Sequence, residues 1–401
     1  METNVIYCGD NTEVLRRHIP DNSIDLIYAD PPFFSNRQYE ILWGDGYELR
    51  AFEDRWKGGI NNYIAWMKPK IAECRRVLKE TGSIYLHCDY HASHRLRELM
   101  DGIFGEDNFR NEIIWYYRRW PAGREQFQRN HDNIYFYTKS SEGIHTFNPQ
   151  YVEPTPETLK RWGKQKQRVT FDKKGKRKPT IELKEKSKGV LMPDVWEISI
   201  IAPSAKERLG YPTQKPEALL ERIINASSNS MDIVLDPFCG CGTTIAVAHK
   251  LGRRWIGIDV SPTACKLMAK RMRNIGLAQV KTIGLPRTVE ELKALQPFEF
   301  QNWVFEKLHG RVNPRKVGDM GIDGWVELDV PTQVKQSEKV GRNVIDKFET
   351  AIRRYGKKKG VIVAFSFTRD AYDEVARVKL LNEMSRLEIK LKTVEEILKT
   401  T

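Results

Sequence analysis

Short apolar runs that end at an acidic residue recur along the first part of the chain. One run covers residues 24–29 and is followed directly by Asp30, and a second lies within residues 231–236. Runs of this length, rich in Ile, Leu and Val, predict buried β-strands. Residues 231–260 read as a buried strand, a glycine-rich turn, a helix and a second strand that ends at Asp259. This order of elements predicts an α/β fold.

A separate set of elements follows Pro297. The pattern predicts a helix over residues 298–308, an amphipathic helix over residues 343–355 and a buried strand over residues 360–366. A chain of 401 residues is long enough for two or three domains. We therefore expect a first domain at 1–285, a linker at 286–297 and a second, smaller α/β domain at 298–401.

Asp30, which follows the first apolar run, is the first residue of the loop Asp30-Pro31-Pro32-Phe33. The prolines fix two φ angles and remove two backbone donors, so carbonyl oxygens there can face a ligand. Asp30 and the Pro31 carbonyl can accept hydrogen bonds from an amine, while the Phe33 ring can stack on a planar ring. This combination suits a nucleobase with an exocyclic amine. The alternative is an ordinary turn at a strand end, because Asp and Pro both favour turns.

The second candidate site is the turn Asp236-Pro-Phe238-Cys-Gly240-Cys-Gly242-Thr243. Glycines let a backbone approach a nucleotide cofactor, and an acidic residue after the next strand can bind ribose hydroxyls. Asp259 lies close to the spacing of roughly 20 residues expected for that partner. The glycines do not match a dinucleotide-binding pattern, and a lone glycine-rich turn is more often structural.

Together, the two motifs resemble those of DNA amino-methyltransferases that use S-adenosylmethionine, in the motif order of the β class. Residues 8–10, 82–89 with 104–109, and 210–216 also fit this family. The resemblance covers about residues 1–285. It implies a Rossmann-like class I methyltransferase sheet of the seven-strand type, with a target-recognition segment inserted at about residues 150–208.

The resemblance also implies the roles of individual residues. Asp30, Pro31, Pro32 and Phe33 correspond to the catalytic motif. The residues that correspond to cofactor-binding positions are Asp10, Thr213, Gln214, Lys215, Asp236, Phe238, Gly240, Gly242, Thr243 and Asp259.

The implied reaction is methyl transfer to an exocyclic amine of a DNA base. That amine is a poor nucleophile because its lone pair is delocalised, and hydrogen bonds to Asp30 and the Pro31 carbonyl would free the lone pair. Catalysis then rests on positioning and electrostatics, and the base must be flipped out of the duplex. An Asp at the first motif position favours adenine N6, with cytosine N4 as the alternative. The chain lacks the Pro-Cys dipeptide of cytosine-C5 methyltransferases.

The charge of the chain favours double-stranded DNA as a partner. The formal net charge is +13, which attracts polyanions. Residues 151–190, within the inserted segment, hold 13 Lys and Arg against 5 Asp and Glu, a net +8. A solvated basic loop and an RNA substrate are the alternatives. A second basic and aromatic cluster, just before the segment 131–137 that corresponds to the lining of the flipped-base pocket, comprises Arg118, Arg119, Trp120, Arg124 and Arg129.

The C-terminal part resembles the Mrr-like branch of restriction endonucleases, through Gly321-Ile-Asp323-Gly324 and Gln333-Val-Lys335 on two expected adjacent strands. The resemblance implies that Asp323 binds Mg²⁺ and that Lys335 orients or deprotonates the attacking water. Gln333 stands where the wider superfamily has Glu, and Glu299 is a further candidate ligand. The alternative is an inactive domain in which Asp323 caps a turn.

The remaining composition adds little chemistry. Six cysteines include none of the common zinc spacings. No apolar run approaches the roughly 18 residues of a membrane span, and the N-terminus lacks a secretory signal, so we expect a soluble cytoplasmic protein without a membrane partner. Relatives of the β class are often dimers, which makes a homodimer an open option.

These patterns predict a bifunctional restriction–modification enzyme: an adenine-N6 DNA methyltransferase followed by an endonuclease. One alternative is a methyltransferase whose C-terminal domain only binds DNA or a partner subunit. Another is a DNA-binding protein that has kept the fold of the cofactor domain without activity.

Overall fold

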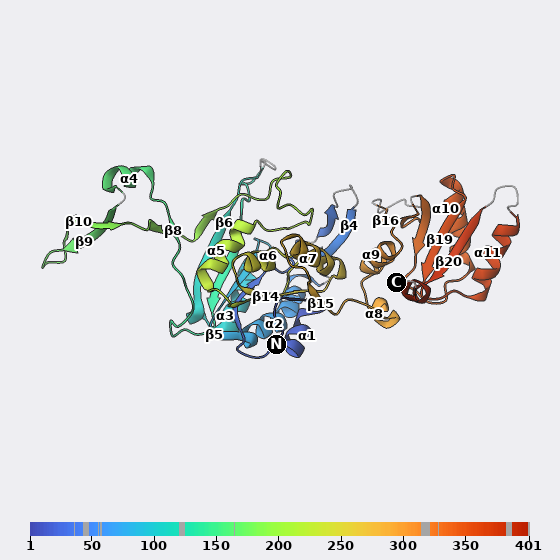
Figure 1. Ribbon diagram of the computed structural model, residues 1–401, viewed down its shortest axis with the longest axis horizontal. Helices are drawn as coiled ribbons and strands as arrows, with labels where there is room; N and C mark the ends of the chain where they lie inside the picture. Colours follow the sequence, from blue (N-terminus) through green and yellow to red (C-terminus); the bar gives the residue numbers. More distant parts are fainter. Residues whose placement is uncertain are drawn as a thin grey trace.

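The computed structural model describes residues 1–35, 37–42, 48–54, 56, 58–119, 125–163, 165–313, 321–327, 329–381 and 387–399. Two α/β units follow one another along the molecule, and a thin arm extends from the first unit away from the second (Figure 1). Trp120 and Arg124 of the predicted basic cluster lie outside the described residues. No helix in the described part of the chain combines the length and apolar character that a bilayer span requires.

The first unit is built on a nine-stranded sheet with the order β12-β6-β7-β5-β2-β13-β14-β1-β15. β7 runs antiparallel to both of its neighbours, and the other pairs are parallel. The short edge strands β12 and β15 extend the seven-strand sheet that the sequence predicts. The strands are β1 (Val5–Cys8), β2 (Ile24–Ala29), β5 (Leu78–Cys88), β6 (Phe109–Tyr116), β7 (His131–Thr138), β12 (Val195–Glu197), β13 (Ile233–Asp236), β14 (Arg254–Asp259) and β15 (Lys281–Ile283).

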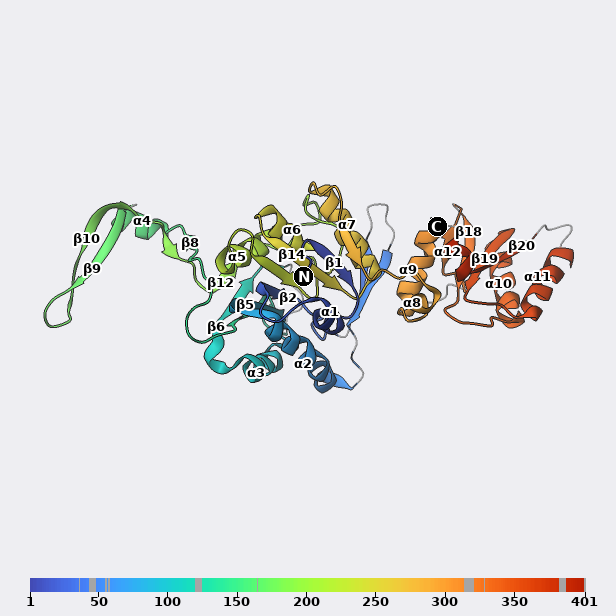
Figure 2. The same ribbon diagram turned by 60° about the horizontal axis from the view of Figure 1, so that its bottom comes forward.

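Helices cover both faces of this sheet (Figure 2). Successive strand side chains point to opposite faces. Ile27 therefore packs in the core beneath α1–α3, whereas Leu26 and Tyr28 pack in the core beneath α5–α7. The first set is α1 (Asn11–His18), α2 (Gly59–Val77) and α3 (Ser93–Phe104), which is followed by the 3-10 turn η1 (Glu106–Asn108). The second set is α5 (Glu217–Ser227), α6 (Thr243–Lys250) and α7 (Pro262–Asn274).

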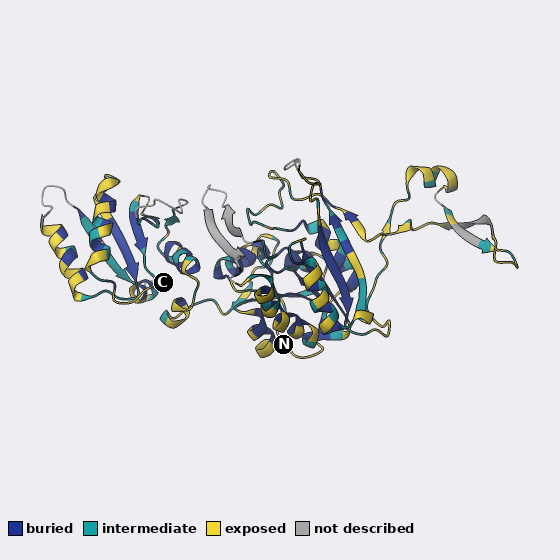
Figure 3. Ribbon diagram, turned by 180° about the vertical axis from the view of Figure 1, so that it is seen from behind, coloured by how far each residue is buried: buried dark blue, intermediate teal, exposed yellow. Residues whose placement is uncertain are grey.

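The arm corresponds to the segment that the sequence predicts as an insertion. Its base is the antiparallel pair β8 (Tyr151–Val152) and β11 (Val190–Leu191). It continues through α4 (Pro156–Trp162) into the hairpin of β9 (Gln165–Phe171) and β10 (Arg177–Lys186). The described part of the arm is largely exposed (Figure 3). A second hairpin, β3 (Arg37–Leu42) with β4 (Glu48–Asp54), follows the Asp30 loop.

The second unit has a five-stranded sheet with the order β16-β17-β18-β19-β20. Its helices α9 and α12 cover one face, and α10 and α11 cover the other. α8 (Val289–Lys293) lies in the range predicted as a linker, and its Leu292 is buried in the core of this unit. The strands are β16 (Arg311–Val312), β17 (Gly324–Val326), β18 (Val330–Val334), β19 (Lys359–Ala364) and β20 (Glu388–Thr393), and the helices are α9 (Pro297–Lys307), α10 (Arg342–Arg354), α11 (Arg369–Leu381) and α12 (Val394–Lys399).

Candidate active site

Four neighbouring parallel strands of the first sheet each end at a predicted functional residue. β2, β13, β14 and β1 lie side by side, and their carboxyl ends share one edge of the sheet. Asp30 follows β2, Asp236 and Asp259 end β13 and β14, and Asp10 lies two residues beyond β1. Ligands of open α/β sheets bind outside such carboxyl ends. A cavity of about 270 Å³ lies at this edge.

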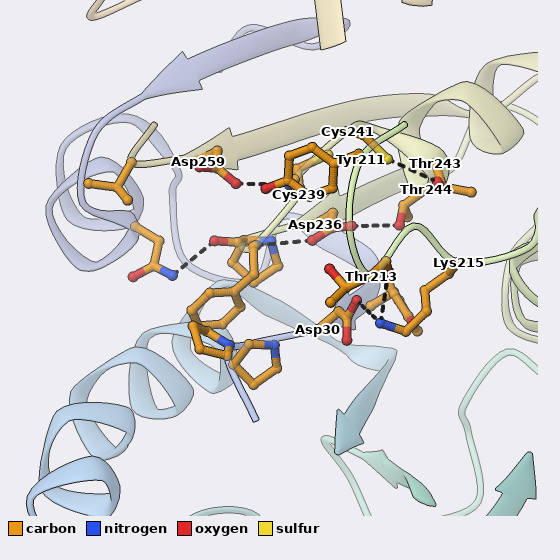
Figure 4. A pocket seen from close by; sticks show the side chains of 18 of the residues that line it. Asp30, Tyr211, Thr213, Lys215, Asp236, Cys239, Cys241, Thr243, Thr244 and Asp259 are labelled. Atoms are coloured by element: carbon orange, nitrogen blue, oxygen red, sulfur yellow. Dashed lines mark hydrogen bonds and ion pairs between the residues drawn. The ribbon is translucent and has the colours of Figure 1, made fainter. Parts of the chain in front are cut away.

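This cavity brings together nearly all the residues that the sequence predicts for the first domain (Figure 4). Gly242 is the predicted residue that does not line it. It is the N-cap of α6 with φ 79°, and a Cβ there would lie 2.9 Å from Cγ of Met268. Gly242 therefore shapes the turn rather than the cavity wall. The predicted residues that line it are Asp10, Asp30, Pro31, Pro32, Phe33, Thr213, Gln214, Lys215, Asp236, Phe238, Gly240, Thr243 and Asp259.

On one side of the cavity, the carboxyl groups of Asp236 and Asp259 each accept two hydrogen bonds. Asp236 accepts from the Thr244 hydroxyl at 2.5 Å and from the Phe238 amide at 3.0 Å. Asp259 accepts from the amides of Gly240 at 2.8 Å and Ser261 at 2.9 Å. Burial outweighs these bonds and raises the pKa of Asp236 to about 7 and that of Asp259 to about 6.

The glycine-rich turn passes very close to an aromatic side chain. Gly240 has φ 53°, and a Cβ there would lie 3.2 Å from Cε1 of Tyr211. Only glycine adopts this conformation without strain and leaves the ring in place. Tyr211 is half-buried and lines the same cavity. The glycine-rich turn and the loop before α5 are therefore in close contact beside the cavity.

Asp10 is held by a buried lysine from α2. Nζ of Lys70 lies 2.7 Å from Oδ2 of Asp10 and 2.9 Å from Oδ1 of Asn11. Burial raises the pKa of Asp10, but the hydrogen bond and charge of Lys70 outweigh it and lower the pKa overall. Asp10 also caps α1 by accepting from the amide of Thr12. This carboxylate is therefore ionised and fixed in direction.

The opposite side of the cavity is built around Asp30. Nζ of Lys215 lies 2.5 Å from Oδ2 of Asp30 and 4.9 Å from the centroid of the Phe33 ring. The other carboxylate oxygen, Oδ1, is buried and has no hydrogen-bond partner in the described part of the chain. Nδ1 of His87 lies 3.7 Å from that oxygen. The carboxylate therefore presents one engaged oxygen and one free acceptor.

The loop that carries Lys215 is stabilised by hydrogen bonds within the loop. Gln214 accepts from the Leu209 amide at 2.8 Å and donates to the Glu207 carbonyl at 2.6 Å. Its amide group thus braces the loop, although the residue lines the cavity. Thr213 has φ 65°, a conformation that β-branched residues rarely adopt. Such backbone strain is typical of functional loops.

In the second unit, the two halves of the predicted nuclease motif lie on neighbouring strands. Asp323 directly precedes β17, and its Oδ2 accepts from the Val334 amide of β18 at 2.7 Å. Lys335 follows β18, and its amide donates to Val363. Gln333 is buried, and its Oε1 has no hydrogen-bond partner in the described part of the chain.

The structure contradicts a metal-binding role for Glu299. Its two oxygens accept hydrogen bonds from the hydroxyls of Ser261 and Thr263, which belong to the first unit. Burial raises the pKa of Glu299 to about 7. Glu299 therefore joins the two units through Ser261 and Thr263, which follow Asp259 closely in the sequence. The neighbouring Gln301 of α9 donates instead to the Asp323 carbonyl at 3.1 Å.

Residues 24–271 match a family model described as DNA methylase, of the N6/N4 type. The chain belongs to this N6/N4 DNA methylase family. The methylase is 32% identical to the type II methyltransferase M.HinfI of Haemophilus influenzae, over 68% of this chain and 69% of that protein. It is also 32% identical to the DNA adenine methyltransferase YhdJ of Escherichia coli K12, over 68% of this chain and 83% of that relative. Among solved structures, the cytosine-N4-specific PvuII DNA methyltransferase aligns over 68% of the methylase and 87% of its own chain, with a TM-score of 0.46 and 18% identity.

A second family model, described as restriction endonuclease and of the Mrr type, matches residues 292–397. The methylase therefore carries an Mrr-like restriction endonuclease domain after its methyltransferase domain. The match includes Leu292, which is buried in the core of that domain.

Several residues of the methylase cavity escaped the sequence analysis. Lys70 is one: a lysine within an otherwise buried face of α2 is a weak signal, because lysine stems often lie on apolar surfaces. His87, which lies behind the cavity beside Asp30, also escaped, since an isolated histidine in a strand is usually structural. The other lining residues without a predicted role are Gly9, Asn11, Tyr28, Trp66, Tyr211, Leu220, Pro237, Cys239, Cys241, Thr244 and Val260.

Proposed function

We propose that the protein transfers the methyl group of S-adenosylmethionine to adenine N6 of a flipped-out base in double-stranded DNA. One observation carries this proposal: the buried Oδ1 of Asp30, which has no hydrogen-bond partner among the described residues, shares a cavity with the glycine-rich turn at Gly240. A buried acceptor without a donor costs about 1–3 kcal/mol. The amine of a flipped base would supply that donor.

The opposite side of the cavity suits the cofactor. Asp259 would accept from ribose hydroxyls, and Gly240 leaves room for a close approach of its backbone. The ionised Asp10, fixed by Lys70, would face the adenosine end. When bound, S-adenosylmethionine supplies a methyl group on an electrophilic sulfonium.

The side of the cavity at Asp30 suits a planar amine. Lys215 engages Oδ2 of Asp30, which leaves Oδ1 to accept from the substrate nitrogen. The Phe33 ring lies beside this carboxylate and can stack on the base. Adenine is the favoured base because a relative of 32% identity is named a DNA adenine methyltransferase. Cytosine N4 is the alternative within the same family.

DNA would contact the basic arm and the nearby ends of β6 and β7. Residues 151–190 carry 13 basic against 5 acidic side chains, and the arm projects freely from the first unit (Figure 1). Arg119 lies 4.6 Å from the Tyr117 ring, and Arg129 lies 4.0 Å from the Tyr90 ring. Guanidinium groups held on aromatic rings keep their donors available for phosphates.

We propose that the second domain cleaves DNA with Mg²⁺ held by Asp323. The Oε1 of buried Gln333, for which the described residues offer no hydrogen-bond partner, supports this role, because Mg²⁺ prefers oxygen ligands. Lys335 would orient the attacking water. The alternative is a domain that only binds DNA or a partner.

Methylation-aware long-read sequencing tests the methyltransferase proposal. DNA from a methylation-deficient host that expresses the protein would carry N6-methyladenine in one sequence motif. DNA from a host that expresses Asp30→Ala would lack it. N4-methylcytosine in that motif would instead identify cytosine as the substrate, and no modified motif would contradict the proposal.

Cleavage of unmethylated and methylated DNA, with and without Mg²⁺, tests the nuclease proposal. We expect Mg²⁺-dependent cleavage that Asp323→Asn abolishes while methyl transfer is unchanged. Asn keeps an oxygen acceptor for the Val334 amide, so the fold is preserved. Absence of cleavage on every DNA would contradict the proposal and favour a binding domain.

A further inference from the structure

A buried polar cluster lies directly behind the Asp30 loop. His87, near the end of β5, is completely buried. Its Nδ1 lies 2.7 Å from the Tyr28 hydroxyl and 3.7 Å from Oδ1 of Asp30. Its Nε2 lies 3.3 Å from Oδ2 of Asp132 on β7. One imidazole thus spans the space between two carboxyl groups from different strands.

The electrostatics of the cluster assign the positions of its protons. Burial, together with the charges of Asp30, Asp236 and Asp132, raises the pKa of Tyr28 far above its usual value, so the phenol keeps its proton. Burial raises the pKa of Asp132, but the hydrogen bond and charge of His87, the charge of Lys215 and the hydrogen bond from Tyr117 lower it overall. Tyr28 therefore donates to Nδ1, and Nε2–H donates to an ionised Asp132. A carboxylate behind an imidazole in this way stabilises the imidazolium that forms on protonation.

We propose that His87, backed by Asp132, positions Asp30 and takes up through it the proton that the substrate amine loses on methylation. This inference rests on the proposed methyl transfer. In that reaction the N–CH₃ bond forms as the S–CH₃ bond breaks, the electron pair stays on sulfur, and the nitrogen becomes cationic. One N–H proton then passes to Oδ1 of Asp30 and on to Nδ1 of His87, as the Tyr28 hydroxyl turns its own proton away from that nitrogen. The transferred proton leaves to solvent after product release.

His87 is a positioning residue, because it does not line the cavity. The polar groups that face it are Tyr28 from β2, Asp30 from the following loop and Asp132 from β7. Tyr117, after β6, donates to Asp132 at 2.8 Å. The rings of Phe33 and Trp115 also lie beside the imidazole, with centroids 5.3 Å and 5.6 Å away. A protonated His87 would place a positive charge 3.7 Å from Oδ1 of Asp30 and weaken that oxygen as an acceptor for the amine, so methyl transfer should decline at low pH.

The experiment is the single-turnover rate of transfer of labelled methyl groups, from about pH 5 to about pH 9, where histidine titrates. The substrate is DNA from a methylation-deficient host. S-adenosylmethionine is saturating, so that the measured rate does not depend on cofactor affinity. We expect His87→Gln to lower the plateau of the pH–rate profile by about 10²-fold. The variant should also lose the decline of the rate at low pH, which is the acid limb of that profile. His91→Gln is the matched control: His91 pairs with Asp89 at 2.8 Å but lies outside the cavity.

Two further variants test the direction of the effect. Asp132→Asn removes the counter-charge of the imidazolium, so the acid limb should move to lower pH. Tyr117→Phe removes a donor to Asp132 and leaves its charge less compensated, so the limb should move to higher pH. These opposite shifts decide the question if His87→Gln does not fold, which circular dichroism and cofactor binding would reveal.

The outcomes separate the two proposals. Absence of label transfer by the wild-type protein would overturn the proposed methyltransferase function and the inference with it. Transfer by the wild type with the same acid limb in His87→Gln, or with no shift in Asp132→Asn and Tyr117→Phe, would overturn the inference alone.

Discussion

Lys215 and Asp30 are 185 positions apart in the sequence, yet their charged groups lie 2.5 Å from each other. The side chain of Lys215 is 8% exposed and that of Asp30 is 17% exposed. The ammonium group also lies over the Phe33 ring. In the sequence, Lys215 corresponds to a cofactor-binding position, whereas in the structure it orients the carboxylate that would hold the target amine.

We predict that Lys215→Met lowers the rate of methyl transfer by about 10²-fold and weakens cofactor binding much less. The reason is that an unpaired Asp30 is free to turn away from the amine, and positioning errors of this kind have effects of that size. Single-turnover rates and calorimetric dissociation constants measure the two effects separately. Lys206→Met, at an exposed position of the same loop, is the control. A loss confined to cofactor affinity would instead support the role that the sequence implies for Lys215.

The pKa of Asp259, about 6 because of burial, makes cofactor affinity depend on pH. In the proposed cofactor site, ribose hydroxyls would donate to the ionised carboxylate, so the affinity should rise by up to about tenfold per pH unit below that value and level off above it. Isothermal titration calorimetry across this range measures the dependence. Asp259→Asn should bind more weakly and with little pH dependence. If the dependence persists in this variant, it arises from Asp236, whose pKa is raised to about 7.

Gly240→Ala should weaken cofactor binding by more than its cost in stability explains. The new Cβ would lie 3.2 Å from the Tyr211 ring, and the residue has a positive φ of 53°. Gly356→Ala is the matched control, because Gly356 has φ 64° and no described residue lies within 4 Å of an added Cβ. Both variants should lose about 1 kcal/mol of stability from the backbone conformation. Equal cofactor affinity in both would show that the contact with Tyr211 is unimportant.

The contact between the two units should weaken as the pH rises. Glu299 ionises near pH 4.3 when unfolded, and burial raises its pKa to about 7 in the folded protein. Between these values the folded state binds more protons than the unfolded state, so stability falls with increasing pH. The full loss is of the order of 3 kcal/mol.

Thermal unfolding of Glu299→Gln between about pH 5 and about pH 8 tests this sign, because the amide does not titrate. We expect the variant to lose less stability than the wild type over that range. Glu306→Gln is the control, since Glu306 pairs with Lys266 at the same junction but is 54% exposed. An identical pH dependence in wild type and Glu299→Gln would refute the prediction.

Local patterns predicted the elements that carry the site because strand and helix periodicity depends on neighbouring residues. The run at residues 24–29 is β2, and the helices expected at 298–308 and 343–355 are α9 and α10 within one residue at each end. The edge strand β12 has three residues, too few for a recognisable period. Its Trp196 is buried, and β12 pairs with β6.

The sequence by itself determined the family, the two-domain order and the acidic, proline and glycine residues of the cavity. These features are encoded in contiguous segments, such as Asp30 to Phe33, whose chemistry depends on their own side chains and backbone. Only the tertiary structure decided which distant groups meet them. Lys215 reaches Asp30, His87 joins Asp30 to Asp132, and Glu299 turns toward Ser261 rather than toward Asp323. Each of these contacts depends on the order of strands in a sheet or on the packing of one unit against another, which no local pattern encodes.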